Sequence, residues 1–199
     1  NISKFLGPFI KDGELDCRIV VGSPDPHGPF KSYARDGHYG INLALFLGQF
    51  CDFPDRFSVK LDVDIKTEKE EKNNLVIIGG PGINMLTNDI NNFLPAKFNI
   101  QRSEEGFSCS GILSEKTGKE ISGRAKGIIA RIRNPYNPEK YILILAGVTV
   151  LGSKAAIIGL TKFTDLVLSR FTGQKSYSCI VEGLDLDSDG KIDSIEVIE

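Results

Sequence analysis

The stretch from Leu75 to Leu94, LVIIGGPGINMLTNDINNFL, contains the pattern that decides the fold. Its first four residues are apolar without interruption, which is typical of a strand buried on both faces of a sheet. Gly79 to Gly82 then turn the chain, and residues 84–94 resemble a helix that Pro95 ends. The stretch therefore predicts a strand, a tight turn and a helix.

Two further segments repeat this unit. Leu15–Gly22 and Tyr141–Ala146 predict buried strands, and each precedes a loop and a predicted helix, at residues 40–50 and 153–170. Ser153 is the expected N-cap of the second helix. Three such units predict an α/β fold with a mostly parallel sheet flanked by helices.

Other segments predict strands that make this sheet mixed. Phe57–Ile65 alternates apolar and polar residues, which predicts a half-exposed strand. Antiparallel hairpins are expected in the middle of the chain, at residues 98–123, and at the C-terminus, where residues 176–184 and 191–198 predict two strands. Ala125–Arg133 predicts another strand, which the sequence NPYNP closes.

Length and composition describe an ordinary globular protein. The 199 residues are 41% hydrophobic and 25% charged, and no Pro/Ser-rich linker divides them. We therefore expect a single domain over residues 1–199. Because the sequence starts without Met, we expect a processed protein or a fragment of a longer chain. A net charge of −2 offers no basic surface for nucleic acid. The longest nearly apolar stretch, Tyr141–Leu151, is shorter than the roughly 20 residues of a membrane-spanning helix.

An acidic motif lies in the terminal hairpin, residues 176–199. In the sequence DLDSDGKIDSIE, from Asp185 to Glu196, oxygen-bearing residues occupy positions 1, 3, 5, 9 and 12, and glycine occupies position 6. This is the spacing of an EF-hand calcium loop, in which clustered carboxylates repel one another unless a cation lies between them. The flanks are rich in β-forming residues, so we expect the loop inside a hairpin. The predicted calcium ligands are Asp185, Asp187, Asp189, the Lys191 carbonyl, Asp193 and Glu196. The alternative is a plain hairpin with solvated aspartates.

Two weaker motifs follow predicted strands. Gly80, Pro81 and Gly82 precede a helix, where backbone amides can bind a phosphate or another anion, and 147–152 is a similar turn. No dinucleotide or P-loop fingerprint accompanies them, so a tight structural turn is the alternative. Asp25, His27, Asp36 and His38 could support base catalysis, but no nucleophile motif accompanies them, which favours a polar surface loop.

The four cysteines, Cys17, Cys51, Cys109 and Cys179, are spread thinly along the chain. They form no CxxC motif, and with only two histidines a histidine-rich zinc site is not expected. Both buried thiols and disulfides are compatible with this spacing.

Several segments taken in order resemble the archaeal S-layer protein family. They are RIVVG at residues 18–22, NLVIIGGP at 74–81, GIIA at 127–130 with NPYNP at 134–138, and ILAG at 144–147 followed by GSKAA at 152–156. The resemblance covers roughly residues 15–170. It implies a non-enzymatic structural or interaction domain at the cell surface, with protein partners that include a second copy and with calcium as a structural ion.

The sequence is also compatible with other functions and another location. The chain has more cysteines and fewer residues than is usual for that family. The second hypothesis is a small-molecule or phosphate-binding domain that uses the turns at 80–82 and 147–152, as the sensor half of a longer regulatory protein, and the cytoplasm is the alternative location. A hydrolase using Asp25, His27 and His38 is the third.

Overall fold

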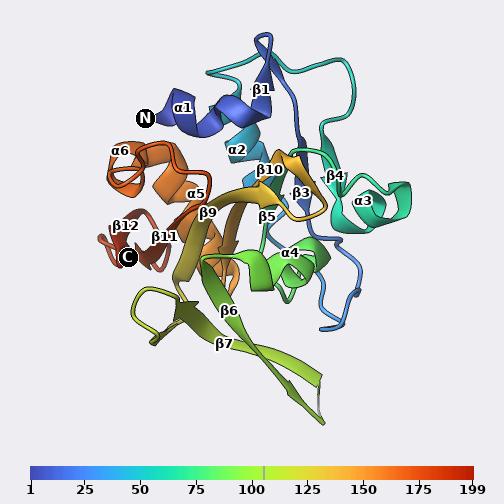
Figure 1. Cartoon of the computed structure of the whole chain (residues 1–199). Helices are drawn as coiled ribbons and strands as arrows, with labels where there is room; N and C mark the ends of the chain where they lie inside the picture. Colours follow the sequence, from blue (N-terminus) through green and yellow to red (C-terminus); the bar gives the residue numbers. More distant parts are fainter. Residues whose placement is uncertain (105) are drawn as a thin grey trace.

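The computed structural model of the protein describes residues 1–104 and 106–199. A seven-stranded sheet forms its centre, in the order β12-β11-β9-β10-β5-β3-β4 (Figure 1). The strands of this sheet are β3 (Arg18–Val21), β4 (Val59–Leu61), β5 (Leu75–Ile78), β9 (Lys126–Asn134), β10 (Asn137–Gly147), β11 (Tyr177–Leu184) and β12 (Ser194–Val197).

The sheet is mixed, with half of its strand pairs parallel. Pairs β3–β4, β3–β5 and β5–β10 are parallel, whereas β9–β10, β9–β11 and β11–β12 are antiparallel. The expectation of an α/β fold is confirmed, but the expectation of a mostly parallel sheet is wrong. The difference arises because the hairpin at Asn134–Asn137 returns β10 beside β9, and both terminal strands extend that antiparallel half.

Helices cover both faces of the sheet. Helices α2 (Tyr39–Leu47), α5 (Val150–Lys162) and α6 (Thr164–Val167) pack on one face, together with α1 (Ile2–Leu6). Helices α3 (Asp62–Glu68) and α4 (Met85–Ile90) pack on the other. Alternate residues of β5 belong to the two cores, Val76 and Ile78 to the first, Leu75 and Ile77 to the second. This explains why the strand is apolar throughout.

Smaller elements complete the molecule. A three-stranded sheet of β6 (Ala96–Ser103), β7 (Gly106–Ser114) and β8 (Glu120–Ser122) closes the second core, and the β6–β7 hairpin projects from the body (Figure 1). A short hairpin joins β1 (Ile10–Lys11) to β2 (Glu14–Leu15). Two 3₁₀ helices span Gly7–Phe9 and Asn91–Phe93.

Two segments differ from the sequence-based expectation. Residues 62–65 were expected to continue a strand, but they begin helix α3. The buried Asp62 accepts hydrogen bonds from backbone amides there, an interaction that alternation of polarity does not reveal. The long helix begins earlier than expected, because the side chain of Thr149, not Ser153, accepts the capping bond from Leu151 N. Ser153 is fully buried inside the helix, which breaks at Phe163 before α6.

Candidate functional site

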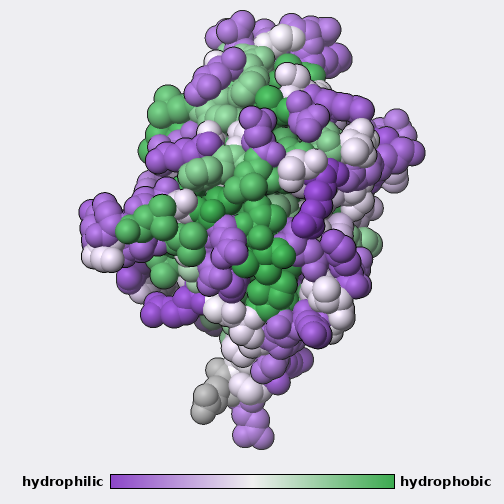
Figure 2. All heavy atoms as spheres, turned by 90° about the vertical axis from the view of Figure 1, so that its left-hand side faces the viewer, coloured by the Kyte–Doolittle hydropathy of each residue, from purple (hydrophilic) through white to green (hydrophobic). Residues whose placement is uncertain are grey.

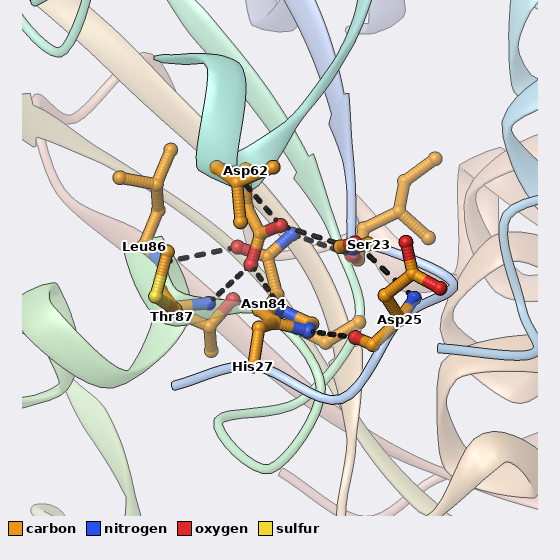
Figure 3. Close-up of polar contacts among 11 residues, drawn as sticks. Ser23, Asp25, His27, Asp62, Asn84, Leu86 and Thr87 are labelled. Carbon is orange, nitrogen blue, oxygen red and sulfur yellow. Dashed lines mark hydrogen bonds and ion pairs between the residues drawn. The ribbon is translucent and has the colours of Figure 1, made fainter. Parts of the chain in front are cut away.

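The polar groups of the fold converge where β3, β4 and β5 end, at the edge of the parallel strands that commonly binds ligands in α/β proteins. Asp62, at the start of α3, is their centre (Figure 3). Its side chain is completely buried and accepts hydrogen bonds from three backbone amides, Ser23 N at 3.0 Å, Val63 N at 2.9 Å and Met85 N at 2.8 Å. These amides come from three separate segments, so Asp62 joins the ends of the strands.

His27 supplies a fourth contact to Asp62 from the loop that follows β3. Its Nε2 lies 2.8 Å from Asp62 Oδ2, and its Nδ1 lies 2.7 Å from the carbonyl oxygen of Asp25. Both ring nitrogens therefore contact acceptor oxygens of the chain itself, and the ring joins the loop after β3 to the start of α3 (Figure 3).

Asn84 and Thr87 fix the turn that carries Gly80, Pro81 and Gly82. Asn84 donates to Ile78 O at 3.0 Å and accepts from Leu86 N at 3.1 Å, which caps α4. Thr87 donates to Gly79 O at 2.8 Å. The amides at the start of α4 therefore have partners within the chain.

The glycines at this edge permit close contact between backbones. A Cβ atom at Gly80 would overlap the Gly147 carbonyl oxygen, and one at Gly22 would overlap the Ile83 carbonyl oxygen. Gly82 differs, because a Cβ there would meet only the Phe30 ring at ordinary contact distance. The space left between the turns at 80–83 and 147–150 is a cavity of about 60 Å³. Small-molecule sites usually measure several hundred Å³.

Asp36 is a second buried carboxylate near this edge, and it lacks the partners that Asp62 has. Both of its oxygens are buried without a hydrogen bond from any of the described residues, as is the hydroxyl of Ser153 on α5. Burial raises the pKa of the Asp36 carboxyl, and its own backbone, the nearby Ser153 hydroxyl and His38 offset only part of that rise. Asp36 and His38 do not join the His27–Asp62 contacts, so the four residues singled out in the sequence do not form one site.

The acidic loop between β11 and β12 lies far from this edge in the sequence and forms its own cluster. Carboxylate oxygens of Asp185, Asp187 and Asp193 lie within 4.8 Å of one another. Asp185 accepts hydrogen bonds from Asp189 N and Gly190 N, which holds the loop in a closed turn.

Two of the other predicted ligands, Asp189 and Glu196, have different surroundings. The Asp189 carboxylate binds the Lys191 ammonium at 2.9 Å and also accepts from Lys191 N, and these bonds hold the pKa of Asp189 below its usual range. Glu196 is on β12, opposite Glu182 in the strand register. Three of the six predicted ligands are thus gathered closely enough to share one cation.

The cysteines are all free thiols, Cys17, Cys51 and Cys179 buried and Cys109 half-buried. Burial raises the pKa of Cys109 to about 11 and that of Cys179 to about 12. Both thiols therefore stay protonated near neutral pH, which agrees with packing and not with nucleophilic chemistry.

The comparisons with known proteins give one distant relative. The chain is 30% identical over 141 residues to the uncharacterised protein MJ0954 of Methanocaldococcus jannaschii. The relative is archaeal. The match covers 67% of this chain and 28% of the relative, so the chain spans less than a third of that protein's length. No family model matches the chain.

Sequence reasoning missed Asp62, the residue with the most contacts in the candidate site. Asp62 lies in a segment that was expected to be a strand, and the alternating pattern of that segment gives no sign that Asp62 accepts hydrogen bonds from three amides. An aspartate next to the start of a helix is a common capping signal, and recognising that helix would have pointed to it.

Proposed function

We propose that this chain is a non-enzymatic, S-layer-like structural or interaction domain that carries a structural calcium ion in its terminal hairpin. The observation that carries the proposal is the occupied crevice at the ends of the parallel strands. In enzymes of this fold class the crevice usually holds the substrate or cofactor. Here the protein's own groups fill it.

The side chain of Asp62 occupies this crevice. Backbone amides that could bind a phosphate instead donate to its carboxyl oxygens, and the His27 ring contacts the same group. The remaining cavity of about 60 Å³ has room for water but not for a nucleotide or sugar. A domain arranged in this way gains rigidity at the strand ends, which suits a scaffold.

Calcium fits the donor set of the acidic loop. Calcium takes hard oxygen ligands at about 2.3–2.6 Å and tolerates irregular geometry. Oxygens of Asp185, Asp187 and Asp193 within 4.8 Å of one another can all reach one such ion. The ion would offset the repulsion among the carboxylates and hold β12 against β11, at the edge of the sheet.

The cellular setting rests on the resemblance of the ordered motifs to archaeal S-layer proteins. The archaeal origin of the distant relative supports this setting, although that relative is itself uncharacterised. No helix in the described ranges 1–104 and 106–199 has the length and apolar character needed to cross a membrane. We place the domain at the cell surface, with the cytoplasm as the alternative.

A thermal melt with and without calcium tests the structural ion. We expect added Ca²⁺ to raise the melting temperature of the wild-type protein and EDTA to reverse that rise, because an ion bound only to the folded state stabilises it. Asp187→Asn should lose most of the calcium effect. Asp165→Asn, an exposed aspartate on α6, is the matched control and should keep it. Equal melting curves in calcium and EDTA would show that the loop has no structural ion.

A ligand screen tests the occupied crevice independently. We expect no thermal shift with nucleotides, sugars or inorganic phosphate. A clear shift that Gly82→Ala abolishes would overturn the scaffold proposal and favour a small-molecule sensor.

A further inference from the structure

The loop between β3 and α2, residues 22–38, crosses the edge of the sheet at which the parallel strands end. We call this loop the strap, and it lies at the lower right of Figure 1. His27 joins it to Asp62 at the start of α3, with 2.8 Å between Nε2 and Oδ2 (Figure 3). Phe30 packs against Phe107 of β7, with 5.4 Å between the ring centroids. Side-chain contacts therefore hold the first part of the strap in place.

Asp36, near the end of the strap, points into the protein. Its side chain is completely buried, and neither carboxyl oxygen has a hydrogen bond from any described residue. A Cβ atom at Gly79 would lie 3.3 Å from Oδ2, so the carboxyl group lies against the turn that follows β5. The buried hydroxyl of Ser153 on α5 lies near the same carboxyl group, but the two form no hydrogen bond. Asp36 thus connects the strap with the turn after β5 and with α5.

The surroundings of Asp36 stabilise its charged form poorly. Ser153 and Gly79, which face it from α5 and from the turn after β5, carry no charge. On its own segment the titratable neighbours are His38 and Tyr39, with 4.2 Å between their ring centroids. Burial, and then the charge of Asp36, raise the pKa of Tyr39, so its phenol is neutral near neutral pH. Burial also raises the pKa of Asp36, and His38 offsets only part of that rise.

A proton is the cation that fits this position. The cavity of about 60 Å³ at this edge is lined by the turns at 80–83 and 147–150, and Asp36 is not part of its wall. A protonated carboxyl group has a donor, and the Ser153 hydroxyl, which no described residue pairs, can accept from it. An ionised carboxylate has only acceptors, and one hydroxyl can serve only one of its two oxygens. The buried arrangement therefore suits the protonated form.

We propose that Asp36 is a proton-dependent anchor, which holds the strap against the strand ends and releases it when the carboxyl group ionises. An ionised carboxylate gains hydration when it leaves the core, and this gain opposes the packing that holds it. The released part follows the contacts of His27 and Phe30 and includes the start of α2, because Tyr39 N donates to Asp36 O at 2.9 Å. Release exposes Ser153 and the first turn of α5 to solvent.

The strap is then closed at low pH and opens as the pH rises. The closed form binds the Asp36 proton more tightly than the open form, in which the carboxyl group has its ordinary pKa of about 4. Above that value the open population grows about tenfold per pH unit, until the pH passes the pKa of the closed form. The anchor is independent of the calcium loop, so it can fail while the proposed function holds.

Hydrogen exchange measured by mass spectrometry, from about pH 4 to about pH 9, tests the anchor. Each rate is divided by the rate of the unfolded chain at the same pH, which gives a protection factor. We expect the protection of residues 33–40 to fall about tenfold or more in the wild-type protein and to stay constant in Asp36→Asn, whose amide cannot ionise. Amides of α6 are the internal reference, because α6 lies at the left of Figure 1, away from the strap, on the side that Figure 2 shows.

Control variants separate Asp36 from the other titratable groups of the strap. Asp25→Asn changes an exposed aspartate, and His38→Gln removes the neighbouring imidazole, and both should keep the fall in protection. His27 is unchanged in Asp36→Asn, so an effect of His27 would persist in that variant. The carboxyl carbon resonance of Asp36 gives a second measurement on the wild-type protein, and we expect it to titrate above the ordinary value of about 4.

Two results would contradict the anchor. The first is protection of residues 33–40 that does not change with pH in the wild-type protein, or that changes equally in Asp36→Asn. The second is an Asp36 carboxyl group that titrates near pH 4 while the strap stays protected. The wild-type measurements decide the question even if Asp36→Asn does not fold.

Discussion

At the scale of single residues, two buried aspartates near the strand ends have opposite surroundings. Asp62 accepts hydrogen bonds from three backbone amides and contacts His27, whereas both oxygens of Asp36 lack a partner in the part of the chain that the structure describes. A buried carboxylate without donors is costly in its charged form, because burial removes its hydration and nothing replaces it. The hydrogen bonds to Asp62 therefore satisfy its buried oxygens, whereas Asp36 is most easily accommodated when protonated.

The stability of the protein should consequently depend on Asp36 and pH. Because the folded-state pKa of Asp36 is raised, the folded state binds the proton more tightly than the unfolded state. The contribution of Asp36 to stability is therefore greatest below the pKa of the unfolded state, about 4. It is lost as the pH rises from that value through the higher pKa of the folded state. Asp36→Asn removes this loss, and we expect it to be more stable than wild type at pH 7, by about 1 kcal/mol or more. The free energy of unfolding from urea titrations at several pH values measures this. A pH dependence identical in the two proteins would contradict the assignment.

At the scale of elements, the turn between β5 and α4 contains two glycines with different surroundings. Gly80 lies against the backbone of Gly147 at the end of β10, and Gly82 faces only the ring of Phe30. The two strand ends can approach closely only because position 80 has no side chain. The element geometry, and not a ligand, accounts for the glycine at this position.

Alanine substitutions at these two positions should have different effects on stability. We expect Gly80→Ala to lower the free energy of unfolding by about 1–3 kcal/mol, because its methyl group must push the β10 backbone away. Gly82→Ala, the matched control in the same turn, should change it by about 0.5 kcal/mol or less. Chemical denaturation of both variants measures the difference. Equal tolerance at the two positions would show that the backbones do not meet there.

At the scale of the whole molecule, Arg131 of β9 joins segments from both ends of the chain. It is buried, and its guanidinium donates to the carbonyl oxygens of Lys4, Phe5 and Gln174. It also lies over the rings of Phe5 and Phe171. Burial lowers the pKa of Arg131, which is held by carbonyl dipoles and aromatic faces and has no carboxylate partner among the described residues. The first helix and the 168–174 segment therefore depend on one side chain from the central sheet.

We expect Arg131→Lys to loosen both termini. A lysine ammonium lacks the planar, forked set of donors that reaches three carbonyl oxygens from one position. The variant should lose about 1–3 kcal/mol of stability, and the amides of residues 2–6 should exchange faster with solvent. Arg133→Lys, on the same strand but stacked on Tyr141 nearer the surface, is the control. Hydrogen exchange detected by mass spectrometry distinguishes them, and unchanged protection at the N-terminus would contradict this role.

The strands with uninterrupted apolar sequence were predictable from local pattern alone. Leu75–Ile78 and the apolar part of β10 are buried on both faces, so every residue there must be apolar and the pattern is visible in the sequence. Residues 62–65 were not predictable in this way, because their alternation suits a strand and Asp62 becomes a helix start only when amides from distant segments reach it. The acidic loop was recognisable because its residues are contiguous, although the cluster of Asp185, Asp187 and Asp193 depends on how the turn closes.

The sequence by itself determined the α/β class, the apolar strands, the glycine turns and the acidic loop, because each depends on neighbours within a few residues. Only the tertiary structure decided the antiparallel half of the sheet, the crevice filled by Asp62 and His27, and the burial of Asp36 beside α5. These features depend on contacts between residues that lie far apart along the chain, such as the 35 positions between His27 and Asp62. Local sequence patterns do not determine which distant groups come into contact, so these features follow only from the packing of the whole chain.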